Sequence, residues 1–389
     1  MRLHTIAKNI LMHQLSVWEK ESFFSPRDII IAGSGFVGLW TAYFLKKIQP
    51  KLNIAIIERG IIPTGASTRN AGFACFGSVT ELMADTKKMG EEKMLELVEW
   101  RFKGLSRIRK IFRDKEIGYE NEGGYELIMP SQQIDINSLR SGLDNFNRKL
   151  RKIVNKNKSF LLADAKIKQM GFSGVQHLVE NKLEGQLHSG KLCSCLLQLV
   201  QSQGVTVLNN IEITSFEKGK RGLILHTNRD VDLSASKLLV CTNAFAKQLL
   251  PDLDLEPARG QVLVTAPLSK LRFKGTFHFD EGFYYFRNLG NRILLGGARN
   301  KALDEERTAT MATTDFIQGE LENFLREIII PGLKYHVDYR WSGIMGIGSE
   351  KMPIVKKINE HLFCAVRMSG MGVALAPEVG RKLAADMLS

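Results

Sequence analysis

Cysteine, long apolar runs and acidic charge are all scarce in this sequence. The five cysteines are too few and too scattered for a disulfide framework, and no two have the C-x-x-C spacing of a zinc or redox site. They are Cys75, Cys193, Cys195, Cys241 and Cys364. We therefore expect reduced cysteines, as in cytoplasmic proteins, and no metal centre.

No stretch approaches the roughly 18 consecutive apolar residues that a membrane-spanning helix needs. The first 24 residues also lack the uninterrupted apolar core of a secretory signal peptide. Both absences predict a cytoplasmic location. Ile6, Ile10 and Leu11 share one face of a short amphipathic helix, which would lie on the protein's own surface or dock peripherally on a membrane.

What is present is the composition of an ordinary globular protein. Of 389 residues, 44% are apolar and 24% are charged, which excludes intrinsic disorder, collagen-like repeats and a disulfide-stapled miniature. The length favours at least two packed units. Basic residues outnumber acidic ones by 54 to 41, for a net charge of +13. A positive net charge says more about the binding partners of a protein than about its fold. Nucleic acid, an anionic membrane and an anionic ligand are all possible partners.

A dinucleotide-binding pattern begins at residue 28. The apolar run DIIIA (28–32) predicts a buried parallel strand, GSGFVG (33–38) follows at once, and a helix is predicted from there to Ile48. A second buried run at 53–57 ends in Glu58, 20 residues after Gly38. Strand, glycines, helix, strand and acid stand in the order of a Rossmann βαβ unit.

Each glycine of this unit has a physical role. Gly33 permits the tight turn, Gly35 lets the backbone approach a pyrophosphate, and Gly38 lets the helix pack closely on the strand. The helix N-terminus offers N–H groups to phosphates, and Glu58 would accept hydrogen bonds from a ribose diol.

A loop of small and polar residues, GASTRNAG (65–72), follows the second strand. Its N–H groups and hydroxyls suit a second contact with pyrophosphate and with a flat ring system, which a nicotinamide enzyme does not need. Here, and at five later places, the sequence resembles the D-amino-acid oxidase-like (DAO) family of FAD-dependent oxidoreductases, in the glycine and sarcosine oxidase group. The later places are GQLH (185–188) with GVTVL (204–208), LLVCTNA (238–244), RGQ (259–261), WSG (341–343) before Met352-Pro353, and SGMGVA (369–374).

The resemblance spans approximately residues 28 to 388 and implies a bound FAD. The N-terminus of the last predicted helix would place N–H groups at the flavin's N1–C2=O edge, where they would stabilise negative charge on the reduced ring. The expected cofactor-binding residues are Gly33, Gly35, Phe36, Val37, Gly38, Glu58, Arg59, Ser67, Thr68, Arg69, Asn70, Ala71, Gly72, Ile213, Thr242, Asn243, Gly343, Gly370, Met371, Gly372 and Val373.

The implied attachment is non-covalent. Tethered members of the family often use a histidine in the loop after the second strand, where this chain has Asn70. Cys75 and Cys364 are the remaining alternatives for a covalent bond.

The implied fold is α/β. It combines a Rossmann-like FAD-binding domain, with a parallel sheet and helices, and a substrate domain with a mixed or antiparallel sheet. The motifs assign residues 28–105, 172–256 and 340–389 to the FAD-binding domain, 106–171 and 257–339 to the substrate domain, and 1–27 to an N-terminal extension. Strand patterns at 125–129, 261–265, 282–287 and 292–296 would form the sheet that covers the flavin.

The resemblance also implies a chemistry. FAD would accept a hydride at N5 from the carbon beside a neutral amine, leaving an imine that hydrolyses, and electrons would pass to O2 or to an unidentified carrier. We expect Tyr284 and His278 to be catalytic, with Tyr285, Arg299 and Trp341 as further pocket candidates. Tyr284 and Tyr285 point to opposite faces of a strand, so only one can face the flavin.

One departure from the family concerns the substrate. Members that act on small amino acids often carry an arginine shortly after Trp-x-Gly, where it clamps the substrate carboxylate, but this chain has Met345 there. A glycine- or sarcosine-like substrate would need Arg69 or Arg299 as a substitute. Otherwise an amine, a polyamine derivative or a larger amino compound is favoured.

Much of the basic excess lies in two clusters, at residues 101–115 and 148–158, and the second is interleaved with apolar residues as an amphipathic basic helix. We interpret both as solvated faces and expect a small-molecule substrate rather than nucleic acid. Two other functions stay open, an FAD-dependent tRNA-modification oxidase and the flavin subunit of a larger dehydrogenase.

Overall fold

The computed structural model describes residues 15–220, 222–229 and 231–389. The helix face expected at Ile6, Ile10 and Leu11 lies outside these residues. None of the described helices combines the length and the apolarity that crossing a bilayer requires.

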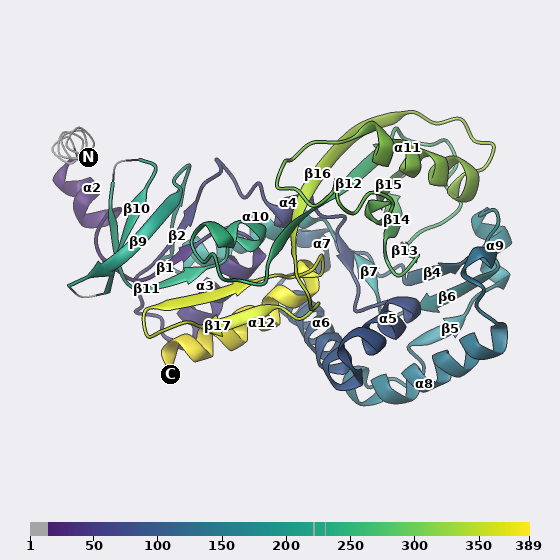
Figure 1. The fold of residues 1–389 in the computed structure, drawn as a ribbon, viewed down its shortest axis with the longest axis horizontal. Helices are drawn as coiled ribbons and strands as arrows, with labels where there is room; N and C mark the ends of the chain where they lie inside the picture. The colour runs from purple at the N-terminus through teal and green to yellow at the C-terminus, as the bar shows by residue number, and fades with distance from the viewer. Residues whose placement is uncertain (1–14, 221, 230) are drawn as a thin grey trace.

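The described chain forms two eight-stranded sheets that lie in separate halves of the molecule (Figure 1). The first sheet has the order β17-β18-β11-β1-β2-β8. β10 branches from this order by pairing antiparallel with the first residues of β11, and β9 pairs antiparallel with β10. Its strands are β1 (Arg27–Ala32), β2 (Ile54–Glu58), β8 (Thr206–Asn209), β9 (Ile213–Gly219), β10 (Gly222–Thr227), β11 (Leu233–Val240), β17 (Ile354–Lys357) and β18 (Leu362–Val366).

The centre of this sheet is parallel, as the βαβ pattern predicts. β1 pairs in parallel with β2 and β11, β2 with β8, and β11 with β18. The central residues of these strands, such as residues 29–31 and 238–240, are apolar and buried because both faces of the sheet are covered. On one face lie α3 (Phe36–Ile48), α6 (Glu91–Ile111), α10 (Ser189–Ser202) and α12 (Gly372–Leu388).

The second sheet is mixed, with the order β16-β12-β15-β14-β13-β4-β6-β5. Its strands are β4 (Gly124–Ile128), β5 (Phe160–Leu162), β6 (His177–Asn181), β12 (Glu256–Thr265), β13 (Thr276–Phe279), β14 (Tyr284–Leu289), β15 (Arg292–Gly297) and β16 (Val337–Ile347). An aromatic core between this sheet and α11 (Asp315–Phe324) fixes one face. The expected α/β fold with a second, mixed sheet is thereby confirmed.

The remaining elements connect or flank the sheets. A two-stranded ribbon joins β3 (Phe73–Ala74) to β7 (Gly185–Gln186). The other helices are α2 (Val17–Ser22), α4 (Ala66–Arg69), α5 (Val79–Met89), α7 (Asp114–Ile117), α8 (Ile136–Val154), α9 (Ala165–Met170), the 3₁₀ segments Pro130–Gln132, Asn243–Gln248 and Arg299–Lys301, and the π-helical turn Leu325–Ile329.

Two segments that the sequence motifs assigned to the FAD-binding domain pair within the second sheet. β6 pairs with β4 and β16 pairs with β12, so residues 177–181 and 340–347 lie in the second sheet and not with the nucleotide-binding segments. Both segments lie close in sequence to cofactor-binding motifs. The sheet to which a strand belongs depends, however, on its backbone hydrogen bonds with other strands, and a cofactor-binding motif carries no information about these. The chain therefore passes from one sheet to the other four times, after β2, β6, β11 and β16.

Candidate functional site

A cavity of about 600 Å³ lies between the carboxyl ends of β1 and β2 and one face of the second sheet. Its wall combines the glycine turn, the loop at 63–73, the segment 241–249, part of β16 and the start of α12. This is the size of a typical cofactor or ligand site.

The glycine turn opens one end of this cavity. Gly33 has a φ of +104°, and a Cβ there would lie 2.9 Å from the carbonyl oxygen of Cys241. A Cβ at Gly35 would lie 3.1 Å from Ser67 Oγ. Gly38 does not line the cavity; a Cβ there would lie 2.1 Å from Gly33 O, so its role is close packing of α3 on β1. The turn is thus closed to side chains and open to a ligand.

Glu58 stands at the end of β2, where the pattern predicted an acid for a ribose. Its Oε2 accepts hydrogen bonds from Ser34 N (3.0 Å) and Ser34 Oγ (2.7 Å), and its Oε1 accepts from Gly60 N (2.8 Å). The carboxylate is oriented by these donors and still lines the cavity. Beside it, the Arg59 guanidinium lies 3.8 Å from the ring centroid of Phe245.

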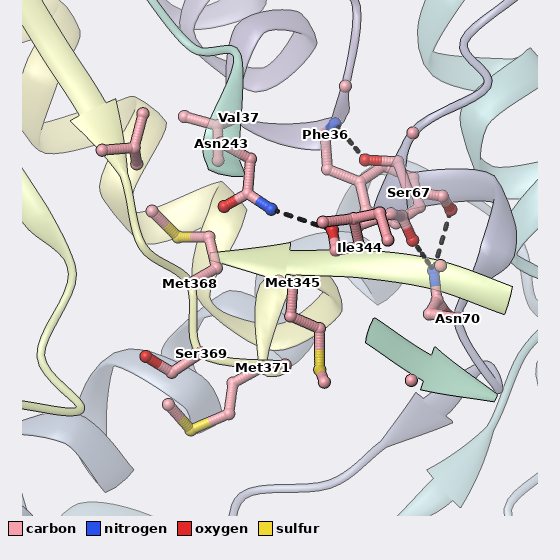
Figure 2. Close-up of a pocket in the computed structure, with 18 of the residues that line it drawn as sticks. Phe36, Val37, Ser67, Asn70, Asn243, Ile344, Met345, Met368, Ser369 and Met371 are labelled. Carbon is pink, nitrogen blue, oxygen red and sulfur yellow. Dashed lines mark hydrogen bonds between the residues drawn. The ribbon is translucent and has the colours of Figure 1, made fainter. Parts of the chain in front are cut away.

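The loop at 63–73 is organised by side chains that bind its own backbone (Figure 2). Ser67 Oγ accepts from Phe36 N (2.9 Å), which joins this loop to the start of α3. Asn70 Nδ2 donates to Ser67 O (2.8 Å), and Asn70 Oδ1 accepts from Gly72 N (2.8 Å). Asn70 therefore holds the loop's shape.

Several polar groups that line the cavity have no partner among the described residues. They include Thr242 Oγ1, Asn243 Oδ1, Ser369 Oγ and His278 Nε2, all buried. The first hydrogen bonds of α12 run from Ala374 N and Leu375 N to Met371 O, which leaves the preceding N–H groups of the helix start available to a ligand. Buried polar atoms of this kind are satisfied in nearly every protein, so the cavity is suited to a polar ligand.

Methionines surround the part of the cavity that joins the two sheets. Met345 projects from β16, and Met368 and Met371 flank the turn that leads into α12 (Figure 2). Such polarisable side chains adapt to a flat ligand. Of the expected cofactor residues, all but Gly38 and Thr68 line this cavity.

The second sheet contributes two aromatic side chains to the cavity, His278 from β13 and Tyr285 from the neighbouring strand β14, and both pack against Phe73 of β3. Phe73 packs edge-on against His278 and Tyr285, with ring centroids 5.0 and 5.9 Å apart. Burial lowers the pKa of His278 to about 4 and raises that of Tyr285 to about 12, so both are neutral at pH 7. His278 thus lies where we expected it, but it is not a cation.

We expected Tyr284 to be catalytic, but the structure places its side chain away from the cavity. Its ring packs in the aromatic core against Phe279 and Phe324, on the far face of the sheet, and Tyr285 faces the cavity. Alternation along the strand allowed only one of the two, and the sequence pattern did not show which.

Arg299 is the cavity-lining arginine whose guanidinium has no hydrogen bond or ion pair among the described residues. Its guanidinium lies 5.5 Å from the ring centroid of Phe283. Arg69, the other candidate clamp, donates instead to Thr64 O and Ser342 O, each at 3.0 Å. Of the two, only Arg299 is therefore free to bind a ligand carboxylate.

The sequence analysis missed a buried ionic cluster at the same end of the cavity, formed by Glu81, Asp85, Arg101 and Lys351. Glu81 Oε1 lies 3.0 Å from both Arg101 Nη1 and Lys351 Nζ, and Lys351 Nζ lies 2.9 Å from Asp85 Oδ1. Burial opposes ionisation of Glu81, but the two cations outweigh it and hold its pKa well below the ordinary range. The cluster joins α5, α6 and the loop after β16 around the cavity.

A spacing signal for part of this cluster was present. Glu81 follows Ser78 by three residues, as in a capping box at the start of α5, and Glu81 and Asp85 share one face of that helix. Arg101 was interpreted instead as part of a solvated basic cluster. In the structure Arg101 is 2% exposed, and Arg107, Arg109 and Arg113 of the same cluster each pair with a carboxylate.

Three other expectations also change. The Thr68 hydroxyl donates to Pro63 O at 2.5 Å, outside the cavity wall. Trp341 Nε1 donates to Arg69 O (2.9 Å) and so positions the loop instead of lining the pocket. Of the two alternative attachment points, Cys364 is buried in the core of the first sheet and does not line the cavity, whereas Cys75 does. All five cysteines are free thiols.

Comparison with known proteins identifies the family of the chain. Residues 28–386 match the DAO family, described as FAD dependent oxidoreductase. The probable oxidoreductase OrdL of Haemophilus influenzae is 23% identical to this chain, over 93% of it and 83% of that protein. Gamma-glutamylputrescine oxidoreductase of Escherichia coli is 23% identical, over 92% and 82%.

Glycine oxidase from Geobacillus kaustophilus has a similar fold, with a TM-score of 0.74 at 19% identity over 93% of this chain and 94% of that one. Because the family match covers nearly the whole chain, this protein is an enzyme of the DAO family of FAD-dependent oxidoreductases.

Proposed function

We propose that this enzyme binds FAD non-covalently and oxidises the C–N bond of an amino acid or of an amine that carries a carboxylate. The observation that carries the proposal is the unpaired Arg299 guanidinium in the same cavity as the nucleotide-binding turn. Relatives named for gamma-glutamylputrescine and glycine support the substrate class.

The residues of the cavity fit FAD. The glycine turn and the start of α3 suit the pyrophosphate, and Glu58 suits the adenosine ribose. The unpartnered Thr242 Oγ1, Asn243 Oδ1 and Ser369 Oγ and the free N–H groups at the start of α12 suit the polar edge of the flavin. When bound, FAD supplies the hydride acceptor.

The chain's own residues then bind and orient the substrate. Arg299 would hold the carboxylate by paired hydrogen bonds, and the Tyr285 hydroxyl, which lines the same cavity within the field of Arg299, would donate a further one. A neutral His278 offers its unpartnered Nε2 without adding a positive charge that would repel a protonated amine. Phe73 and the methionines exclude water from this end of the cavity.

The direct test is anaerobic reduction of the purified protein. Loss of flavin absorbance on adding amino acids, but not the corresponding 2-hydroxy acids, would support C–N oxidation, and the rate of reoxidation by O2 would then identify an oxidase or a dehydrogenase. Acid precipitation should release the flavin into the supernatant. A colourless protein that does not take up added FAD would contradict the cofactor site, and reduction only in the presence of tRNA or of a second subunit would favour one of the other functions.

Replacing Arg299 with methionine should raise KM for carboxylated substrates by about 10- to 100-fold, because a hydrogen bond to a charged group contributes about 1.5–3 kcal/mol. KM for the matching amine without a carboxylate should change little. Arg299→Lys, which keeps the charge but not the paired geometry, should fall between. Equal loss with both substrates would show that Arg299 only supports the fold of the pocket.

Replacing His278 with asparagine should leave the shape of the pH profile unchanged between about pH 5.5 and 8, because His278, with a pKa near 4, stays neutral throughout. The measurement is kcat/KM against pH for both proteins with one substrate. A limb near pH 6.5 that is present in the wild type and absent from the variant would contradict this assignment.

A further inference from the structure

We propose that Arg287 raises the reduction potential of the bound FAD, by placing an uncompensated positive charge behind the loop that lines the flavin part of the cavity. This inference rests on the proposed cofactor site. Nothing in the family motifs pointed to this residue.

Arg287 lies on β14 two residues after Tyr285, so both side chains leave the same face of the strand. It is 6% exposed and does not itself line the cavity. Its Nη2 lies 3.2 Å from the position that a Cβ of Gly72 would occupy, and Gly72 does line the cavity. The guanidinium is therefore separated from the ligand space by the backbone of one glycine.

This charge has no counterion in contact with it among the described residues. Within the part of the chain that the structure describes, no carboxylate lies within 4.0 Å of the Arg287 guanidinium, no hydrogen bond reaches it, and its Nε is buried without a partner. Glu120, the acid whose field acts on Arg287, accepts instead from Gln186 Nε2 at 2.6 Å. Burial lowers the pKa of Arg287 to about 10, which still leaves it charged at pH 7.

Of the four other buried arginines in the described chain, Arg27 has no carboxylate partner but donates to Asn53 Oδ1, Ser22 O and Phe23 O, and the remaining three are paired with carboxylates. Arg101 binds Glu81, Arg259 binds Glu306 and Arg367 binds Asp254. An unpaired buried charge is costly, and such groups cluster at functional sites, where a second charge develops during the reaction. Arg287 is the exception beside the cofactor cavity.

A flavin that accepts a hydride gains two electrons and one proton and so becomes an anion. A fixed cation in a site of low dielectric stabilises this anion more than the neutral oxidised ring, which raises the potential. His188 experiences the same field, since burial, Lys191 and Arg287 together lower its pKa. Arg287 touches neither substrate nor cavity, so it is an electrostatic positioning residue and not a catalytic one.

The test is the midpoint potential of the flavin in the holoenzyme, measured by spectroelectrochemical titration. Arg287→Met should make reduction at least tenfold less favourable, which is a fall of about 30 mV for a two-electron couple. Arg287→Lys should retain most of the wild-type value. Glu120→Gln, at an exposed position, should shift the potential upward, because it removes the negative charge that partly offsets Arg287.

These variants separate charge from packing. If Arg287 had only a structural role, Arg287→Met and Arg287→Lys would change the midpoint potential equally, and Glu120→Gln would not raise it. That result would overturn the inference. An unchanged midpoint potential in Arg287→Met would overturn it as well. If Arg287→Met does not retain flavin, its potential cannot be measured. In that case an unchanged midpoint potential in Glu120→Gln is by itself enough to overturn the inference. Failure of the wild-type protein to bind FAD would instead refute the cofactor site itself.

Discussion

Replacing Gly104 with alanine should destabilise the protein by about 3 kcal/mol and reduce its FAD content, although alanine is the better helix former by about 1 kcal/mol. Gly104 lies in α6 where this helix crosses the first turn of α12. A Cβ at this position would lie 1.8 Å from the carbonyl oxygen of Ala374, a backbone atom that cannot rotate away. The helices must therefore separate.

The reason that the cofactor is affected is the position of this crossing. Gly372, Val373 and Ala374, at the start of α12, line the cavity, so a displaced α12 moves the N–H groups that face the ligand. Urea unfolding and flavin absorbance per mole of protein measure the two effects.

Gly142 offers a matched control. It lies inside α8, and a Cβ there would meet nothing within 4 Å. Gly142→Ala should be neutral or stabilise the protein by up to about 1 kcal/mol, with unchanged flavin content. If the Gly104 and Gly142 variants were equally stable and equally yellow, close contact between α6 and α12 would not limit the site.

Replacing Arg101 with methionine should cost about 3–5 kcal/mol of stability, because removing one partner of a buried pair leaves the other charge uncompensated. Glu81 is 7% exposed and would keep only Lys351 as a counterion. The exposed pair Arg113–Glu116 provides the control, and Arg113→Met should leave the stability nearly unchanged, because solvent screens that pair. The measurement is again the free energy of unfolding.

The pH dependence of this loss has a definite sign. The folded-state pKa of Glu81 lies well below its ordinary value of 4.5, so the unfolded chain binds the proton more readily as the pH falls. The contribution of the cluster is complete above pH 4.5 and is lost progressively below it. Arg101→Met should therefore weaken the acid-side decline in stability, and an unchanged decline would show that Glu81 is not held ionised by Arg101.

The local elements of the nucleotide site could be predicted from the sequence because each depends on a short segment. Gly33, Gly35 and Glu58 stand within one βαβ unit, and their spacing alone places them around one turn. The start of α12 could be predicted only through resemblance, since nothing local connects Met371 to Gly33.

The substrate end could not be predicted in the same way. The choice between Tyr284 and Tyr285 depends on which face of β14 turns toward the first sheet, and that is decided by packing against α11 and Phe324. Arg101 looked like one more surface cation, because its partners Glu81 and Lys351 come from elements that meet it only in the folded chain. Arg287 escaped notice for the opposite reason, that it has no partner at all.

The alternation of the chain between its two sheets also bears on how the enzyme is assembled. β1 must pair with β11, more than 200 residues later, and β11 must then pair with β18. Contacts so distant in sequence slow folding and favour partly folded intermediates, and neither half of the molecule is a continuous piece that could be expressed alone. We therefore expect the cofactor to bind late in folding. Because FAD would bind only the completed cavity, its supply during expression should set how much of the chain reaches the native state.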